Sequence, residues 1–467
     1  MRLAKHAKVE PDPVACQTLL ALLPWTLYLD LTMPTIENRQ LVFVNRYFYP
    51  DDSSTGQLLF ELACALVRRG FSVTVWCGYP AYSSRGRRLR VPARETIDGV
   101  HVVRLRSARF SKDRLLGRIL NDLTFFLAVL WNLLWLDGKR QEKMLFLYST
   151  NPPFLAWAGR LARLFGKPHR YVVQLHDVYP ELAVRFGALR GNRPLYRIWE
   201  RINRSTYGAA EHTVALCRAT ERLLHARYPE TRGHTSVIPN WADGTFLRPL
   251  PRAQNPFVRE HGLEKHFVLL YSGNLGLGYE YDTLLDAMSL LADDPAYLLL
   301  FIGEGGKRTA LEAEVRHRGL KNVRFLPYQP RSVLPYSLSA GDVFCVTIGP
   351  GIEGLSFPSK LYSALAVGAP VLVVAEAGSE LRQIVEEAGC GLAFGYGESS
   401  SLAEAVRRLR ADANWRATLG ARARALFEAR YQLEHAAEAY AALFRGLGVE
   451  TRGEKDRSTV DSCTERP

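Results

Sequence analysis

Short apolar runs alternate with longer amphipathic stretches along most of the 467-residue chain. Runs this apolar are typical of parallel strands that are buried on both faces, and the stretches between them carry apolar residues at helical spacing. The repeated strand, loop and helix therefore predict an α/β fold with parallel sheets. The expected strands of a first sheet are Leu41–Val44, Phe71–Trp76, Met144–Tyr148 and Tyr171–Leu175, and those of a second are Phe267–Tyr271, Tyr297–Ile302, Val323–Tyr328, Asp342–Thr347 and Pro370–Val374.

The beginning of the chain does not fit this pattern. Residues 14–31 are mostly apolar, but Pro24 and Asp30 interrupt them, which argues against a membrane-spanning helix. Acidic residues before this stretch do not suit the basic start of a signal peptide. Two interpretations stay open: translation starts at Met33, or residues 14–31 form a weak membrane-facing helix.

The composition is that of a soluble globular protein, with 47% apolar and 23% charged residues. The formal charge of +13 favours an anionic partner, which could be nucleic acid, a phosphorylated substrate or an acidic membrane face. Seven cysteines are scattered without CxxC pairs or metal-ligand spacing, which indicates a reducing, cytoplasmic compartment and predicts no metal site.

A strongly basic stretch, Arg85–Arg118, precedes an apolar and aromatic one, Leu123–Leu136. The second stretch is too short to span a bilayer as a helix, at about 1.5 Å per residue. It fits either a helix that lies on an anionic membrane surface or a buried core helix. Its aromatic residues form one block and do not alternate with the arginines as a base-stacking platform would, so nucleic-acid binding is not expected.

The segment Gly351–Val371 carries the most specific chemistry. A glycine-broken loop with one carboxylate, Glu353, leads to Pro358, which is expected to open a short apolar helix. Ser359 and Lys360 fall in the first turn, where a hydroxyl, free backbone N–H groups and an ammonium could hold a diphosphate. This combination indicates nucleotide-sugar chemistry, with an ordinary loop, helix and strand unit as the alternative.

Three further loops follow expected strands, at the sheet edge where α/β proteins bind their ligands. An imidazole there can hydrogen-bond a sugar hydroxyl, and a carboxylate can accept from acceptor hydroxyls. A GxxGxG spacing differs from the dinucleotide fingerprint and does not indicate a dehydrogenase. The residues concerned are Thr55 and Gly56 in the first loop, His176 and Asp177 in the second, and Gly273, Gly276 and Gly278 in the third.

With these motifs, the stretch from about Leu41 to about Gly446 resembles the retaining, family-4 glycosyltransferases of the two-domain GT-B fold. The Pro-Ser-Lys helix start is similar to the branch that includes fucosamine-type transferases of surface polysaccharide assembly. The resemblance implies two Rossmann-like parallel-sheet domains that face a central cleft, with a last helix that crosses back to the first domain. The expected boundaries are an uncertain N-terminal extension at 1–40, an acceptor domain at 41–245, a linker at 246–265, a donor domain at 266–428, the crossover helix at 429–448 and a disordered tail at 449–467.

The resemblance also implies roles for the site residues. A nucleoside diphosphate sugar, with a UDP-sugar favoured, is expected to bind without a metal or other cofactor. Catalytic roles fall to Glu353, near the sugar hydroxyls, and to His176 and Asp177. The expected donor-binding residues are Gly56, Gly273, Asn274, Gly276, Tyr328 beside the nucleobase, Pro358, Ser359, Lys360 and Ser363.

Two positions depart from the family pattern. Many relatives carry arginine where this chain has Asn274. The relatives also carry a second glutamate that grips the ribose, whereas alignment on Gly368–Val371 puts Ser363 in its place. A serine offers one acceptor oxygen, whereas a carboxylate offers two. The positive charge beside the leaving diphosphate must then come from Lys360, or from Arg331.

We therefore expect a cytoplasmic transferase, peripheral to the inner face of the plasma membrane, that moves a sugar to a surface glycan or polyprenyl-linked acceptor. An anionic membrane surface is an expected partner, and nucleic acid is not. Two alternatives remain. A catalytically impaired, nucleotide-sugar-binding homologue would explain Ser363 and Asn274, and a GT-B nucleotide-sugar 2-epimerase would need several acid/base carboxylates around the sugar.

Overall fold

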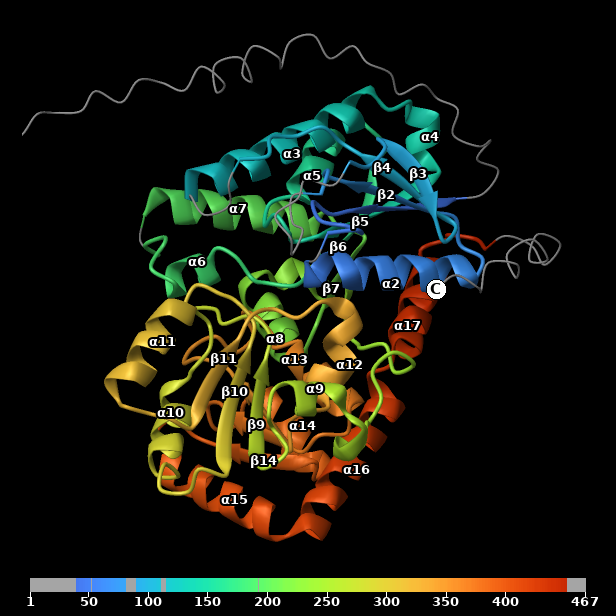
Figure 1. Ribbon diagram of the computed structural model, residues 1–467. Helices are drawn as coiled ribbons and strands as arrows, with labels where there is room; N and C mark the ends of the chain where they lie inside the picture. Colours follow the sequence, from blue (N-terminus) through green and yellow to red (C-terminus); the bar gives the residue numbers. More distant parts are fainter. Residues whose placement is uncertain (1–38, 52, 81–89, 111–114, 192, 452–467) are drawn as a thin grey trace, which may run out of the picture. The chain divides into compact units, whose positions relative to one another are not determined.

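The computed structural model describes residues 39–51, 53–80, 90–110, 115–191 and 193–451 (Figure 1). Almost all of the expected N-terminal extension and of the expected tail lies outside the described residues. So do two parts of the basic stretch, residues 81–89 and 111–114.

The first sheet has eight strands in the order β3-β4-β2-β1-β5-β6-β7-β8. All neighbours are parallel except β3 and β4, so the carboxyl ends of β1, β5 and β6 share one edge. The strands are β1 (Gln40–Val44), β2 (Val73–Cys77), β3 (Arg94–Ile97), β4 (Val100–Arg104), β5 (Met144–Ser149), β6 (Arg170–Leu175), β7 (His212–Ala215) and β8 (Thr235–Val237).

The helices of the first domain follow the strands in the expected βαβ manner. Helix α2 begins where the Ser53 hydroxyl accepts from the backbone N–H of Gly56 at 3.1 Å, and its leucines at 59, 62 and 66 are buried against the sheet. The bounds are α2 (Ser54–Arg68), α3 (Leu115–Trp135), α4 (Gly138–Glu142), α5 (Trp157–Leu164), α6 (Glu181–Arg185), α7 (Pro194–Gly208), α8 (Arg218–Arg227) and the 3₁₀ turn η1 (Pro229–Thr231).

Two features of this domain differ from the sequence-based expectation. Part of the basic stretch forms the β3–β4 hairpin, whose turn holds Asp98 at φ +47° and Gly99 at φ +76°. The apolar helix is also longer than expected, because α3 spans 21 residues from Leu115. The argument that it is too short to span a bilayer is therefore wrong. Its polar first part was not recognised as helix, since Asn121 and Asp122 turn inward to bond Phe110 and Arg46.

The second sheet has six parallel strands in the order β11-β10-β9-β12-β13-β14. Its strands are β9 (Phe267–Ser272), β10 (Tyr297–Ile302), β11 (Val323–Leu326), β12 (Val343–Thr347), β13 (Val371–Val374) and β14 (Gly391–Phe394). The helices and 3₁₀ turns around it are η2 (Arg252–Gln254), α9 (Pro256–Glu260), α10 (Asp282–Ser289), α11 (Arg308–His317), η3 (Arg331–Val333), α12 (Leu334–Leu338), α13 (Lys360–Ala366), α14 (Glu380–Ala388), α15 (Ser399–Ala411) and α16 (Ala413–Arg430).

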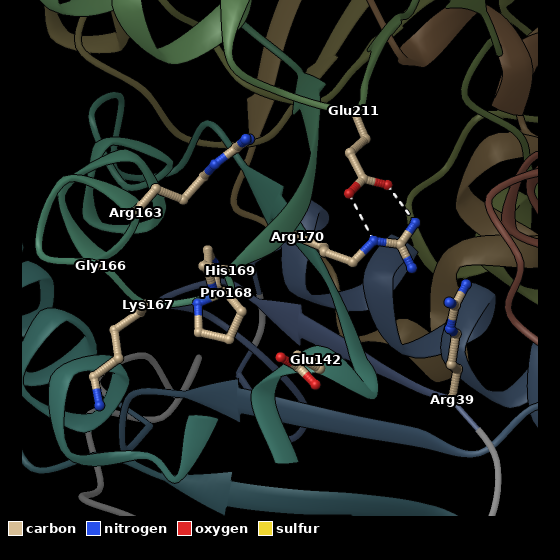
Figure 2. Close-up of a pocket in the computed structure, with 9 residues that line it drawn as sticks. All are labelled: Arg39, Glu142, Arg163, Gly166, Lys167, Pro168, His169, Arg170 and Glu211. Carbon is tan, nitrogen blue, oxygen red and sulfur yellow. Dashed lines mark hydrogen bonds and ion pairs between the residues drawn. The ribbon is translucent and has the colours of Figure 1, made fainter. Parts of the chain in front are cut away.

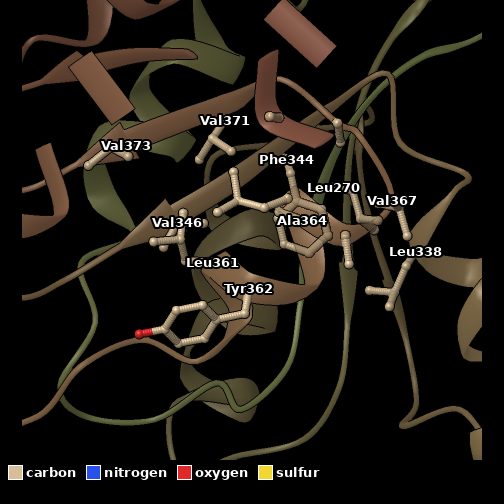
Figure 3. Close-up of a cluster of buried hydrophobic side chains, with 14 of the residues drawn as sticks. Leu270, Leu338, Phe344, Val346, Leu361, Tyr362, Ala364, Val367, Val371 and Val373 are labelled. Atoms are coloured by element: carbon tan, nitrogen blue, oxygen red, sulfur yellow. The ribbon is translucent and has the colours of Figure 1, made fainter. Parts of the chain in front are cut away.

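Helix α13 is held rigidly against this second sheet. Figure 3 shows Leu361 and Ala364 of α13 among Leu270, Val346 and Val371 of three neighbouring strands, and all five are fully buried. Close packing of this kind leaves the helix little freedom to shift. The first residue of α13, Lys360, is therefore fixed in place by the core behind it.

The last helix, α17 (Leu433–Gly446), returns to the first domain, where it lies beside α2 (Figure 1). Its Tyr440 and Phe444 belong to the same buried cluster as Phe43 of β1 and Phe71 before β2. The predicted architecture of two parallel-sheet Rossmann-like domains with a crossover helix is thus confirmed.

Candidate donor site

Lys360, at the start of α13, is a buried lysine at the carboxyl edge of the second sheet. Its side chain is only 7% exposed, and its Nζ donates a hydrogen bond to the Tyr271 hydroxyl at the end of β9. The same Nζ lies 3.8 Å from the centre of the Tyr271 ring and 3.6 Å from that of Tyr279. Two aromatic faces attract a cation, but they do not neutralise it as a carboxylate would.

Burial without a carboxylate partner affects the ionisation of this lysine. In the described part of the chain, no Asp or Glu forms an ion pair with Lys360. Burial lowers the pKa of Lys360 well below its usual value, because the ammonium is taken out of water. A phosphate group beside Nζ would oppose this shift and favour the charged form.

Glycine loops border Lys360 on one side. Gly273 has φ +135°, and a Cβ placed there would lie 3.5 Å from Cε of Lys360. Gly303 has φ +143°, and its Cβ would fall 2.0 Å from the carbonyl oxygen of Gly273. Only glycine fits such a backbone conformation and such a contact, so the two loops can pack together next to the lysine.

The loop that carries Glu353 is tied to both domains. The Glu353 carboxylate accepts a hydrogen bond of 2.9 Å from the backbone N–H of Glu380 at the start of α14. The Glu380 carboxylate in turn accepts from the N–H groups of Arg218 and Ala219 at the start of α8, at 3.0 and 2.7 Å. Burial raises the pKa of Glu353, an effect that the bond from Glu380 opposes and the Glu380 charge strengthens.

His176 and Asp177 lie at the end of β6, beside this loop. Asp177 pairs in a backbone bridge with Ser356, and the N–H of Val178 donates to the Leu355 carbonyl at 2.8 Å. Burial raises the pKa of Asp177. Burial also lowers the pKa of His176 to about 4, so its imidazole is neutral near pH 7. The structure thus brings the segment of His176 and Asp177 into contact with the loop that carries Glu353.

Helix α13 begins almost as expected. The helix proper starts at Lys360, and its first turn is closed by bonds from Leu361 N to Pro358 O and from Tyr362 N to Ser359 O, both 3.1 Å. Pro358 is buried and Ser359 is exposed, so the serine hydroxyl can reach a ligand from the surface.

The other expected donor-binding residues occupy varied positions. Asn274 is exposed in the glycine loop, and Ser363 is half-buried in α13. Tyr328 follows β11 with 40% of its surface exposed. Gly56 is buried at the start of α2, where a Cβ would lie 2.8 Å from the Ser53 hydroxyl and 3.2 Å from a neighbouring backbone nitrogen. These contacts give Gly56 a role in the packing of its own loop.

Arg331, the second expected source of positive charge, has a different partner. Its guanidinium forms an ion pair of 2.8 Å with Glu61 of α2 and lies over the ring of Phe246. Glu61 also accepts from the indole N–H of Trp241 at 3.1 Å. Arg331 therefore links the two domains, which leaves Lys360 as the stronger candidate for the diphosphate.

Sequence reasoning missed the tyrosines that surround Lys360. Tyr271 is the next-to-last residue of an apolar strand, where an aromatic residue reads as core. Tyr279 lies just beyond the glycine loop, outside the glycine positions that the motif marks. The sequence held one indication that both tyrosines could face the same ligand: they flank a glycine-rich turn, at positions 271 and 279.

A separate cavity of about 620 Å³ lies at the opposite edge of the first sheet (Figure 2). Its lining residues precede or begin β1, β5, β6 and β7, which puts it at the amino ends of the strands. Arg163 and Lys167 donate to the carbonyls of Ala209 and Leu136, and Arg170 pairs with Glu211 at 2.7 Å. These cations bind the chain itself, so we place the functional site at the carboxyl edge.

Models of known protein families match both domains of this chain. Residues 55–241 match the glycosyl transferase 4-like domain, and residues 254–426 match the glycosyl transferases group 1 domain. The fold and the site together define a two-domain glycosyltransferase of the GT-B class. The chain belongs to the group 1 and 4-like glycosyltransferases.

Three similar proteins illustrate the relationship. The probable glycosyltransferase WbjE of Pseudomonas aeruginosa is 30% identical over 283 residues, which cover 61% of this chain and 69% of WbjE. The putative colanic acid biosynthesis glycosyl transferase WcaI of Escherichia coli K12 is 37% identical over 151 residues, 32% of this chain and 37% of WcaI. The Anabaena protein HepE, solved in complex with UDP-glucose, shares the fold with a TM-score of 0.63 and 18% identity, over 87% of this chain and all of HepE.

Proposed function

We propose that this enzyme is a retaining glycosyltransferase that moves a sugar from a UDP-sugar to a surface glycan or a polyprenyl-linked acceptor. The observation that carries the proposal is Lys360, a buried lysine between two tyrosine rings and a glycine loop, with no carboxylate to pair with in the described part of the chain. A donor diphosphate supplies the negative charge that this arrangement lacks.

The relatives support the choice of substrates. WcaI is named for colanic acid biosynthesis, which supports a polysaccharide pathway, and HepE binds UDP-glucose, which supports uridine as the base. The resemblance to fucosamine-type transferases extends the proposal to a hexose or amino-sugar donor.

The proposed reaction breaks the bond between the sugar C1 and the diphosphate oxygen, and forms a bond from C1 to the acceptor oxygen on the same face. The acceptor proton passes to the leaving diphosphate. Lys360 stabilises the negative charge that develops on the leaving group, a contribution often worth several kcal/mol. Glu353, His176 and Asp177 contact the sugar and acceptor hydroxyls, and no metal ion takes part.

Turnover tests this proposal directly. The enzyme is incubated with a panel of UDP-sugars and with lipid-linked glycans extracted from membranes, and UDP release and the anomeric configuration of the product are measured. We expect transfer with retained configuration, no effect of EDTA, and a loss of rate of about 100-fold in Glu353→Gln.

The alternatives predict different results. Interconversion of UDP-sugars without any acceptor would identify an epimerase. Nucleotide binding without turnover would support the impaired homologue, for which Ser363 and Asn274 are the specific observations.

We also propose that the enzyme works in the cytoplasm on an anionic membrane surface, which α3 contacts. Phe125, Val129 and Leu133 on the inner face of α3 are fully buried. The outer face is an apolar stripe whose side chains are 44–70% exposed, and helices with one such face lie in the membrane interface. Its members are Leu116, Ile119, Leu123, Leu127, Trp131 and Trp135.

A further inference from the structure

A chain of hydrogen bonds connects the crossover helix α17 to His176. Strand alternation puts Val172 and Gln174 on one face of β6, and Val172 packs in the same buried cluster as Tyr440 of α17. His176 follows the last residue of the strand. The Gln174 amide nitrogen donates to the Tyr440 hydroxyl at 2.7 Å. The amide oxygen of the same side chain lies 3.2 Å from Nε2 of His176.

This geometry determines which ring nitrogen carries the proton. With its NH₂ group occupied by Tyr440, Gln174 presents its oxygen to the imidazole, and an amide oxygen can only accept. Nε2 of His176 must therefore be the protonated nitrogen, and Nδ1 is left as an acceptor. Gln174 is 2% exposed and Tyr440 is fully buried, so water does not compete for these bonds.

We propose that Gln174 and Tyr440 are positioning residues, which hold His176 as the neutral Nε2–H tautomer so that Nδ1 accepts a hydrogen bond from a sugar hydroxyl. The hydroxyl partner rests on the proposed function, whereas the tautomer rests on the hydrogen bonds alone. The crossover helix then has a second task besides packing: it supplies, through Tyr440, the group that orients the amide.

The tautomer can be measured without any substrate. The full chain is labelled with ¹⁵N-histidine, and the imidazole signals of His176 are assigned by their loss in His176→Gln. We expect a protonated Nε2 and a bare Nδ1 at pH 7.5. A protonated Nδ1 would overturn the proposal, because it would mean that the amide is flipped and that Tyr440 donates to it.

Matched variants separate positioning from packing. Gln174→Leu removes the acceptor, and we expect a mixture of the two tautomers. Gln174→Glu keeps an oxygen at the same place, so it should keep the Nε2–H tautomer. The new carboxylate should also raise the pKa of His176 from about 4. Asp177 and Tyr440 are the other ionisable groups nearby, and they are the same in both proteins. An unchanged spectrum in Gln174→Leu would also overturn the proposal.

Kinetics provide the functional readout, with UDP release from the best UDP-sugar as the assay. Gln174→Leu and Tyr440→Phe should lower kcat about tenfold while UDP affinity changes less than twofold, and Gln174→Glu should recover most of the rate. If UDP affinity fell as much as kcat in these variants, the result would indicate a packing defect instead. If the spectrum is as expected but no UDP binds, the proposed function fails and the tautomer assignment stands.

Discussion

Burial disfavours the charged form of Lys360, so the ionisation of this lysine depends on whether an anionic ligand is bound. In the unfolded chain the lysine titrates near its usual pKa of about 10.4, whereas in the folded protein burial lowers its pKa well below that. The unfolded state therefore binds more protons over the range between the two values. A diphosphate beside Nζ would raise the pKa of Lys360 again, because its negative charge favours the ammonium form. Donor binding should therefore be accompanied by proton uptake.

The first prediction follows from this difference. The free energy of unfolding of the wild type should rise with pH relative to Lys360→Met, with a slope of up to about 1.4 kcal/mol per pH unit between the folded pKa and about 10. Urea unfolding of both proteins at several pH values from 7 to 10 measures the slope. Parallel curves for the two proteins would mean that Lys360 stays fully charged in the fold.

Gly303 gives the second prediction at this scale. Gly303→Ala puts a methyl group 2.0 Å from the Gly273 carbonyl at φ +143°, so it should lower the free energy of unfolding by about 1–3 kcal/mol and weaken nucleotide binding. Gly306→Ala is the matched control, because no atom lies within 4 Å of its new methyl group. Thermal melts and UDP titrations compare the two variants, and equal behaviour would count against a tightly packed glycine loop.

Among the elements, α3 combines a buried face with an exposed apolar one. For the proposed membrane contact, its length allows two arrangements: a helix that spans the bilayer, or one that lies in the plane of the membrane. Residues 116–135 are long and apolar enough to cross a bilayer by length and composition, and 28% of the most apolar window is buried in the protein. The fully buried Phe125 and Leu133 tie the helix to the first domain, which favours a position in the plane of the membrane.

The third prediction tests this position. The wild type should sediment with vesicles that contain phosphatidylglycerol, more weakly as salt rises, and Leu127→Glu with Trp131→Glu should weaken binding at least tenfold. Leu290→Glu, on a 46% exposed leucine after α10, serves as the control. No vesicle binding by the wild type would contradict the proposal, and resistance to alkaline extraction from membranes would indicate a spanning helix.

The elements also show where sequence patterns succeed. Fully apolar runs such as Phe267–Tyr271 located the central strands, because burial on both faces leaves no polar positions. The β3–β4 hairpin was missed because its strand Arg94–Ile97 is half-exposed and rich in charge, although Asp98-Gly99 is a recognised turn pair. The start of α3 was missed because its polar residues bond inward.

On the scale of the whole molecule, the site depends on contacts between distant parts of the chain. The sequence placed Glu353 and Lys360 after a strand of the second sheet and His176 after a strand of the first, because ligand loops follow the carboxyl ends of parallel strands. Their roles in the site stay predictions. The sequence could not show that Glu353 bonds the start of α14, or that Tyr440 reaches Gln174 across 266 positions. Such pairs depend on how helices and loops pack, which no local pattern records.

The central claim is that Lys360 holds the diphosphate of the donor, and titration calorimetry with UDP tests it most directly. GDP, ADP and CDP serve as competitors for the base, and Lys321→Ala, at an exposed lysine, controls for the loss of one positive charge. We predict that the wild type and Lys321→Ala bind UDP with proton uptake, and that Lys360→Ala binds it about 10- to 100-fold more weakly. Equal affinity in Lys360→Ala, or no binding of any of the four nucleotides by the wild type, would contradict the account.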